Sequence, residues 1–133
     1  MVAIKESAVL LVVEDDTAMR SLICDEFWDL GLRIVEAGDG DEALQRIAEH
    51  QPDLILTDLR MPAGGLDYVA RLRTVAPSCP IILMTAFGDP RVRTEALQAG
   101  VTAYFSKPVR MSDLKTAVKD LLDHKTGANG NSR

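Results

Sequence analysis

Residues able to hold a metal ion and a phosphoryl group stand where short apolar segments of the chain end. Glu14 and Asp15 directly follow the first apolar segment, and Asp58 closes the third. Thr85 closes the fourth segment, and Lys107 follows the fifth. If these segments are parallel strands, their carboxyl ends meet at one edge of a sheet, where ligands of such folds bind. We therefore expect all five side chains to surround one small volume.

Crowded carboxylates favour a bound cation. Two of them about 5 Å apart repel by roughly 3 kcal/mol at an effective dielectric of about 20. Glu14 and Asp15 offer the hard oxygen ligands that Mg²⁺ prefers, and Lys107 and Thr85 are donors for a phosphate-like group. Asp58 is the best nucleophile, since an aspartate that attacks phosphorus forms an acyl phosphate. The set predicts phosphoryl transfer, which depends on positioning and charge neutralisation.

Each of these residues has an ordinary alternative role when taken alone. The acidic triplet 14–16 could be a solvated loop, and Asp16 is expected to cap the following helix. Asp58 could serve a turn, while Thr85 could be a plain strand residue. Only the agreement of four strand ends favours a common site.

The elements that must position these residues follow from hydropathy. Continuous apolar runs too short for helices predict strands buried on both faces. Segments with apolar residues at three- and four-residue spacing predict helices between them, with Pro90 in a first turn and Ser112 as a cap. Strand and helix alternate five times, which predicts an α/β fold with a doubly wound parallel sheet. The expected strands are 8–13, 32–36, 54–56, 81–84 and 102–106.

Composition limits the function. The chain has 133 residues, a net charge of −5, a pI near 4.9 and 47% hydrophobic residues, which fits one globular domain. The acid excess argues against direct nucleic-acid binding, and no apolar run is long enough to span a membrane. The first residues lack a signal-peptide core, and Cys24 and Cys79 match no metal spacing, so we expect a cytoplasmic protein with reduced thiols. We expect an N-terminal extension (1–7), one domain (8–124) and a flexible tail or linker (125–133).

Several stretches together resemble the receiver domain of two-component response regulators, similar in extent to the stand-alone chemotaxis and sporulation phosphorelay regulators. That resemblance implies a flavodoxin-like sheet of strand order 2-1-3-4-5 with five flanking helices. The stretches that carry it are 10–16, 38–44, 53–62, 84–86 and 99–108.

The resemblance also implies roles for individual residues. Asp58 accepts a phosphoryl group from a phosphohistidine of a sensor histidine kinase or histidine phosphotransfer protein. Glu14 and Asp15, with Asp58 and the backbone carbonyl of Arg60, bind Mg²⁺. Thr85 and Lys107 contact the phosphoryl oxygens.

A switch is implied as well. Tyr104 moves with Thr85, so that the face built from the fourth helix, fifth strand and fifth helix changes shape, although Tyr104 could also be a plain core aromatic. The Lys107–Pro108 bond is commonly cis in the family. Such a protein is a phosphoacceptor with slow autodephosphorylation rather than a conventional enzyme.

The sequence departs from the family pattern in the loop beside Asp58 and at the first acid. The segment 63–66 is one residue short, so we expect a reshaped, flexible loop. Glu14 stands where aspartate is more common, and its longer side chain could reach the metal through a water. Arg60 and Phe87 flank the path of an attacking water in this family, so we expect slow hydrolysis of the acyl phosphate.

Other classes remain to be weighed. A phosphatase of the haloacid dehalogenase type needs a second acid where this chain has Arg60, and a nucleotide binder needs a phosphate loop that the acids 14–16 would repel. A degenerate receiver that acts only as a protein-binding module is the main alternative. The output is open: a stand-alone regulator that docks on a downstream protein target, an N-terminal module of a longer regulator, or a phosphorylation-dependent homodimer.

Overall fold

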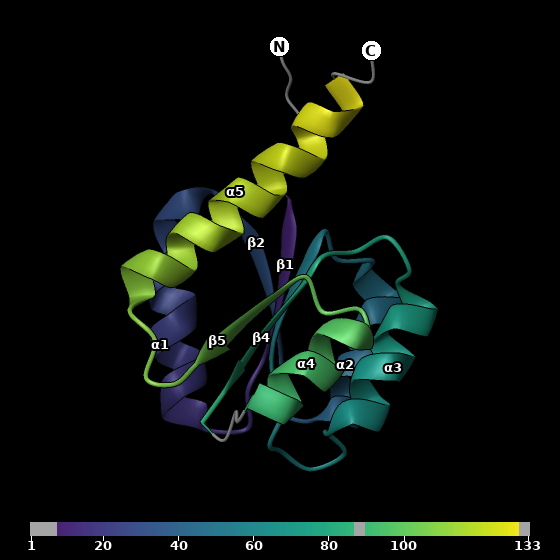
Figure 1. Cartoon of the computed structure of the whole chain (residues 1–133). Helices are drawn as coiled ribbons and strands as arrows, with labels where there is room; N and C mark the ends of the chain where they lie inside the picture. The colour runs from purple at the N-terminus through teal and green to yellow at the C-terminus, as the bar shows by residue number, and fades with distance from the viewer. Residues whose placement is uncertain (1–7, 87–89, 131–133) are drawn as a thin grey trace.

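Five parallel strands form one sheet, with helices on both faces (Figure 1). The structure is a computed structural model and describes residues 8–86 and 90–130. The strands are β1 (Val9–Val13), β2 (Arg33–Ala37), β3 (Leu54–Asp58), β4 (Ile81–Thr85) and β5 (Ala103–Ser106). The helices are α1 (Thr17–Phe27), the 3₁₀ helix η1 (Trp28–Leu30), α2 (Gly40–His50), α3 (Leu66–Val75), α4 (Pro90–Gln98) and α5 (Met111–Gly130).

The strand order is β2-β1-β3-β4-β5, which confirms the doubly wound, flavodoxin-like sheet. β3 and β4 are buried along their whole length, as their continuous apolar sequences predict. Every strand pair is parallel, so the carboxyl ends of all five strands lie at one edge of the sheet. That edge is the expected place for a ligand.

Alternation along the strands divides the core into two layers. Leu10 and Val12 of β1 face α1 and α5, where they pack with Phe27 and Leu114. The alternate β1 residues pack in the second layer, under α2, α3 and α4. Figure 1 shows the same division, with α1 and α5 on one side of the sheet and the other three helices opposite. Successive side chains of a strand point to opposite faces, so both layers come from one short apolar run.

The helix ends follow the expected chemistry at most positions. Asp16 caps α1, because its Oδ1 accepts a hydrogen bond from the Met19 amide at 2.9 Å. Gly31 ends η1 at φ 73°, in the left-handed region that glycine favours. Pro90 is the first residue of α4.

The expected cap of α5 is wrong. Ser112 does not cap the helix, because α5 begins at Met111 and Ser112 lies inside its first turn. Helical backbone continues to Gly130, so it reaches into the segment for which the sequence predicts a flexible tail or linker. Once a helix is nucleated, each added residue extends it at little cost, so its end need not coincide with the end of its apolar pattern.

Candidate functional site

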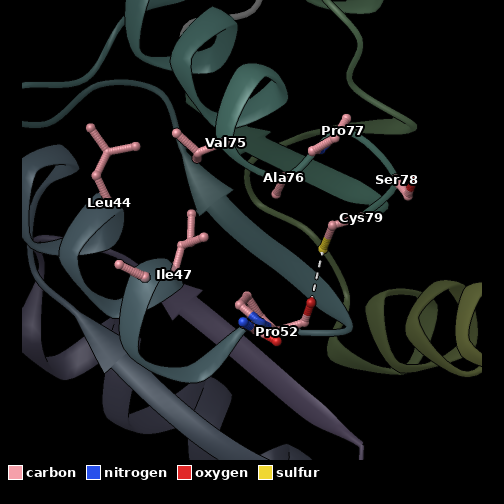
Figure 2. Close-up of a pocket in the computed structure, with 10 residues that line it drawn as sticks. Leu44, Ile47, Pro52, Val75, Ala76, Pro77, Ser78 and Cys79 are labelled. Carbon is pink, nitrogen blue, oxygen red and sulfur yellow. Dashed lines mark hydrogen bonds between the residues drawn. The ribbon is translucent and has the colours of Figure 1, made fainter.

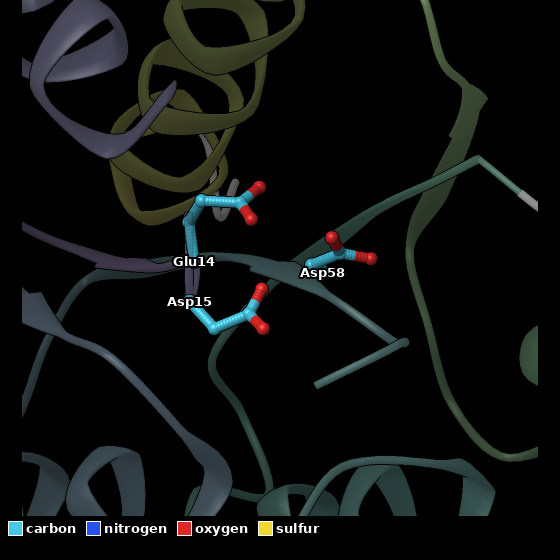
Figure 3. Close-up of side chains that lie close together, drawn as sticks. All are labelled: Glu14, Asp15 and Asp58. Atoms are coloured by element: carbon cyan, nitrogen blue, oxygen red, sulfur yellow. The ribbon is translucent and has the colours of Figure 1, made fainter. Parts of the chain in front are cut away.

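The sheet brings the chemically capable residues together at its carboxyl edge. β1 pairs with β3 at Val13 and Thr57, so Glu14 and Asp58 follow neighbouring strand positions. Asp15 comes next along the chain, and the three acidic side chains lie close together (Figure 3). Each offers an oxygen, and these oxygens lie within 4.8 Å of one another.

Lys107 bridges two of the acids. Its Nζ donates to Glu14 Oε1 at 2.8 Å and to Asp58 Oδ2 at 2.9 Å. The other oxygen of Asp58, Oδ1, accepts from the backbone amides of Leu59 at 2.6 Å and Arg60 at 3.1 Å. The phosphoacceptor candidate is therefore held at both oxygens, by an ammonium on one side and by its own loop on the other.

Burial differs among the three acids. Glu14 is 1% exposed and Asp58 is 5% exposed, whereas Asp15 is exposed. Burial raises the pKa of Glu14 above its usual value, and the charge of Asp58 adds to that effect against the opposing hydrogen bond from Lys107. Burial also disfavours the charge on Lys107, but its hydrogen bonds to Glu14 and Asp58 outweigh burial and raise the pKa of Lys107.

The donor set suits a hard divalent cation. Three clustered carboxylates and one ammonium leave a formal excess of negative charge, and two of these carboxylates, those of Glu14 and Asp58, are buried. Clustered oxygen ligands, several of them anionic, fit Mg²⁺ better than softer metals. The histidines and cysteines of the described residues take no part in this cluster.

Thr85 and Tyr104 lie on the two strands beside the acids. Thr85 is fully buried, and its carbonyl accepts the Lys107 amide at 2.9 Å, which ties β4 to the segment after β5. Tyr104 pairs with Leu83 in the β4–β5 ladder and packs against the layer under α2, α3 and α4. Its hydroxyl is buried with no hydrogen-bond partner among the described residues. A buried hydroxyl without a hydrogen-bond partner costs free energy. The hydroxyl of Tyr104 therefore does not stabilise the present position of this side chain.

Arg60 is exposed, and its amide donates to Asp58 Oδ1. Phe87 lies outside the described residues. The Lys107–Pro108 bond is cis, as the resemblance implies.

The loop after Asp58 is held more firmly than the sequence predicts. The Gly64 amide donates to Met61 O and the Gly65 amide to Leu59 O, both at 2.9 Å. The Gly40 amide of α2 also donates to Pro62 O at 3.0 Å. These bonds close the shortened loop into a compact turn against α2.

Arg20 of α1 supports the site and was not predicted. Its Nη1 donates to the Glu14 carbonyl at 2.6 Å, and its Nε donates to Glu36 Oε1 at 3.0 Å. The guanidinium thereby fixes the backbone carbonyl of Glu14 and links it to Glu36 of β2. The sequence offers one indication of this role: Arg20 lies four residues after the Asp16 cap, which is one turn of helix from the end of β1.

A concavity lies away from the acids, beside residues that precede β3 and β4 (Figure 2). It is lined mainly by apolar side chains, among them Leu44, Ile47 and Val75, and Cys79 Sγ donates to the Pro52 carbonyl there at 3.4 Å. Its lining includes no charged side chain, so it does not provide the chemistry of a phosphate or metal site. No helix among the described residues has the length and apolar character needed to cross a membrane.

A doubly wound sheet whose carboxyl edge carries clustered acids and a bridging lysine defines a class of small α/β proteins with an acidic ligand site. Comparison with known families specifies it further. The model of the response regulator receiver domain matches residues 10–119, and the chain belongs to that family.

Similar proteins agree with this assignment. The chain is 34% identical over 119 residues to the two-component response regulator PhoP of Pseudomonas aeruginosa, covering 89% of this chain and 53% of PhoP. It is 29% identical over 118 residues to sporulation initiation phosphotransferase F of Bacillus subtilis, covering 88% and 95% of the two chains. The chain thus spans about half the length of PhoP but nearly all of the Bacillus protein.

Among solved structures, a CheY-like receiver domain from Methanospirillum hungatei superposes with a TM-score of 0.86 at 25% identity, covering 91% of this chain and 98% of that one. The receiver domain of a Luxo repressor protein from Vibrio parahaemolyticus gives the same TM-score at 27% identity, over 92% and 95% of the two chains. These neighbours support the flavodoxin-like fold of the receiver family.

Proposed function

We propose that this chain is a phosphoacceptor whose Asp58 takes a phosphoryl group from a phosphohistidine of a partner kinase or phosphotransfer protein. The observation that carries the proposal is the way Asp58 is held: Oδ2 on the Lys107 ammonium, Oδ1 on two loop amides, beside two further carboxylates. An Asp58 oxygen forms the new P–O bond as the P–N bond of the phosphohistidine breaks, and the imidazole leaves. The chain acts as a substrate in this transfer and is not a conventional enzyme.

Glu14, Asp15 and Asp58, with the Arg60 backbone carbonyl, would hold Mg²⁺. The ion would neutralise the carboxylates and the incoming phosphoryl oxygens. The ammonium of Lys107 already lies within hydrogen-bond distance of Asp58 Oδ2. It can therefore stay close to the Asp58 carboxylate and to the phosphoryl oxygens during the transfer. The buried surroundings of Glu14 and Asp58 strengthen these electrostatic contacts, since the local dielectric is lower than in water.

The proposed output is a change of shape on the α4–β5–α5 face. A phosphoryl group brings about −1.5 to −2 charges and three acceptor oxygens. Thr85 ends β4, the strand beside β3, and its hydroxyl would donate a hydrogen bond to one of these acceptors. Tyr104, whose own hydroxyl has no partner among the described residues, would then move into the space that the Thr85 side chain leaves. The partner that binds this changed face is a downstream protein, an output domain of a longer regulator, or a second copy of this chain. The proposal places the protein in the cytoplasm with its kinase.

Labelling with acetyl phosphate tests the proposal. The wild-type chain should gain the mass of one phosphoryl group when Mg²⁺ is present and should gain none in EDTA. Asp58→Asn should abolish the gain, whereas Asp41→Asn, a matched change at an exposed position of α2, should leave it intact. Labelling that persists in Asp58→Asn would contradict the assignment of the acceptor.

A degenerate receiver that binds partners without phosphorylation is the second candidate. The resemblance alone leaves it open, but an orphaned Asp58 would better fit such a protein than the Asp58–Lys107 pair does. Failure of the wild-type chain to take up phosphoryl groups with Mg²⁺, while it still binds a partner kinase, would favour this alternative.

A further inference from the structure

Two buried hydroxyls, those of Thr57 and Tyr68, lie next to the backbone of Asp58. Thr57 is fully buried in an otherwise apolar stretch of β3, and Tyr68 of α3 is 3% exposed. Their oxygens are 2.8 Å apart. Thr57 Oγ1 also donates to the backbone carbonyl of Asp58 at 2.8 Å. The pair thus connects α3 to the backbone of the phosphoacceptor.

The chemistry of a hydroxyl sets the direction of this chain of hydrogen bonds. Threonine has a single hydroxyl proton, and Thr57 donates it to Asp58 O. The proton between the two hydroxyls must then come from Tyr68. Burial raises the pKa of Tyr68, and the nearby charge of Asp58 raises it further, so the phenol keeps the proton that it donates.

The ring of Tyr68 also lies close to the loop that follows Asp58. A Cβ added at Gly40 would lie 3.0 Å from Tyr68 Cδ1 and 1.8 Å from the carbonyl oxygen of Ala63. Ring, glycine and loop are therefore packed without spare room. The Gly40 amide further bonds the loop at Pro62 O. Tyr68 thus contacts Thr57, the residue before Asp58, and also packs near Gly40, which holds the loop that follows Asp58.

Stability alone does not explain a polar pair at this place. Replacing both partners of a buried hydrogen bond by apolar groups of the same shape can be nearly neutral for stability. Here that holds for the bond between the two hydroxyls, whereas the Asp58 carbonyl would lose its hydrogen bond from Thr57. Valine and phenylalanine would fill the positions of Thr57 and Tyr68 with little change of volume. What they would lose is the direction that the hydrogen bonds impose on the Asp58 backbone.

We propose that Tyr68 is a positioning residue for phosphoryl transfer: through Thr57 it fixes the backbone that aims Asp58 and the amides of Leu59 and Arg60. The inference rests on the proposed function of Asp58. Its physical basis is that small displacements of a reacting group lower rates steeply, and that partners behind metal ligands commonly change metal affinity about 10- to 100-fold.

The test uses the full chain and four variants: Tyr68→Phe, Thr57→Val, the double variant and Thr57→Ser. We expect the double variant to fold but to unfold at a lower urea concentration than the wild type, because Thr57→Val removes the hydroxyl that donates to the Asp58 carbonyl. We also expect it to bind Mg²⁺ about tenfold more weakly and to take up phosphoryl groups from acetyl phosphate about tenfold more slowly. Tyr68→Phe and Thr57→Val should each show most of this loss, because the two residues act as one unit. Thr57→Ser keeps the hydroxyl and should retain the Mg²⁺ affinity and the rate of phosphoryl uptake of the wild type.

Thr74→Val is the matched control, because Thr74 is an exposed residue of α3 whose hydroxyl donates to Ala70 O of the same helix. The amide resonances of Leu59 and Arg60 should shift in the double variant and not in this control. The inference is overturned if the double variant binds Mg²⁺ and takes up phosphoryl groups within about twofold of the wild type. It is also overturned if Thr57→Ser is as impaired as Thr57→Val. If the wild type itself takes up no phosphoryl group, the proposed function fails, while Mg²⁺ affinity and the amide resonances still decide the role of Tyr68.

Discussion

Replacing Glu14 by glutamine should make the protein more stable when divalent cations are absent. The change removes one of three clustered carboxylates and keeps Oε1, the atom that accepts from Lys107. Burial raises the pKa of Glu14, and this effect exceeds the opposing hydrogen bond from Lys107. In the metal-free protein at neutral pH, the buried position of Glu14 therefore disfavours its ionised carboxylate.

The magnitude follows from two distances. Oxygens of Glu14 and Asp58 lie within 4.8 Å, where two unit charges repel by about 3 kcal/mol at an effective dielectric of about 20. The charged hydrogen bond from Lys107, at 2.8 Å, offsets about 1.5–3 kcal/mol, and glutamine retains part of it. The expected gain in the free energy of unfolding at neutral pH is thus about 1 kcal/mol.

The pH dependence has a definite sign. A carboxyl whose pKa is raised in the folded state contributes stability below its unfolded pKa, near 4.5, and loses that contribution as the pH rises through the folded pKa. Glutamine does not titrate. Wild type and Glu14→Gln should therefore have similar stability at about pH 4 and diverge at higher pH, with the variant the more stable.

Urea unfolding in EDTA at several pH values measures this difference, with Glu95→Gln, an exposed position of α4, as the control. Adding Mg²⁺ should stabilise the wild type more than the variant, because a ligand that binds only the folded state adds to stability. The reasoning would be refuted if Glu14→Gln were less stable than the wild type at neutral pH without metal, or if the difference did not change with pH.

Three further predictions concern the loop, the core and the lifetime of the phosphorylated state. Gly40→Ala should lower the free energy of unfolding by about 3 kcal/mol or more, since its Cβ would lie 1.8 Å from Ala63 O; a loss below about 1 kcal/mol in urea unfolding would contradict this packing. Ile55→Ala, at a fully buried site of β3, should cost about 2–5 kcal/mol by the same assay. Phosphorylated Asp58 should decay over minutes or longer with Mg²⁺ present, and Arg60→Ala should speed that decay as followed by mass spectrometry; decay of the wild type within a few seconds would count against a shielding role.

The sequence predicts the sheet and the chemistry at its edge because both are written in local patterns. A short continuous apolar run bounded by polar residues is typical of a strand buried on both faces, so the sequence alone predicts β3 and β4. Their polar neighbours Asp58 and Thr85 could be assigned to one edge once the strands were taken as parallel. The cap at Asp16 is equally local, since it needs only its own turn of helix.

The contacts that hold the site depend on residues far apart in the chain. Lys107 reaches Glu14 across 93 residues and Asp58 across 49, and no local pattern specifies which carboxylate oxygen it takes. The bond between Thr57 and Tyr68 joins a strand to the helix after it, and the same two residues read singly are a strand threonine and a core aromatic.

The sequence by itself therefore determined the class of fold, the set of reactive residues and the edge of the sheet where they gather. The tertiary structure decided which of them touch: Lys107 between two acids, Arg20 behind Glu14, and the closed turn after Asp58. The physical reason is that burial and helix or strand periodicity are properties of neighbouring residues. Hydrogen-bond partners and pKa shifts, in contrast, depend on distances of a few ångströms that only the packed chain sets.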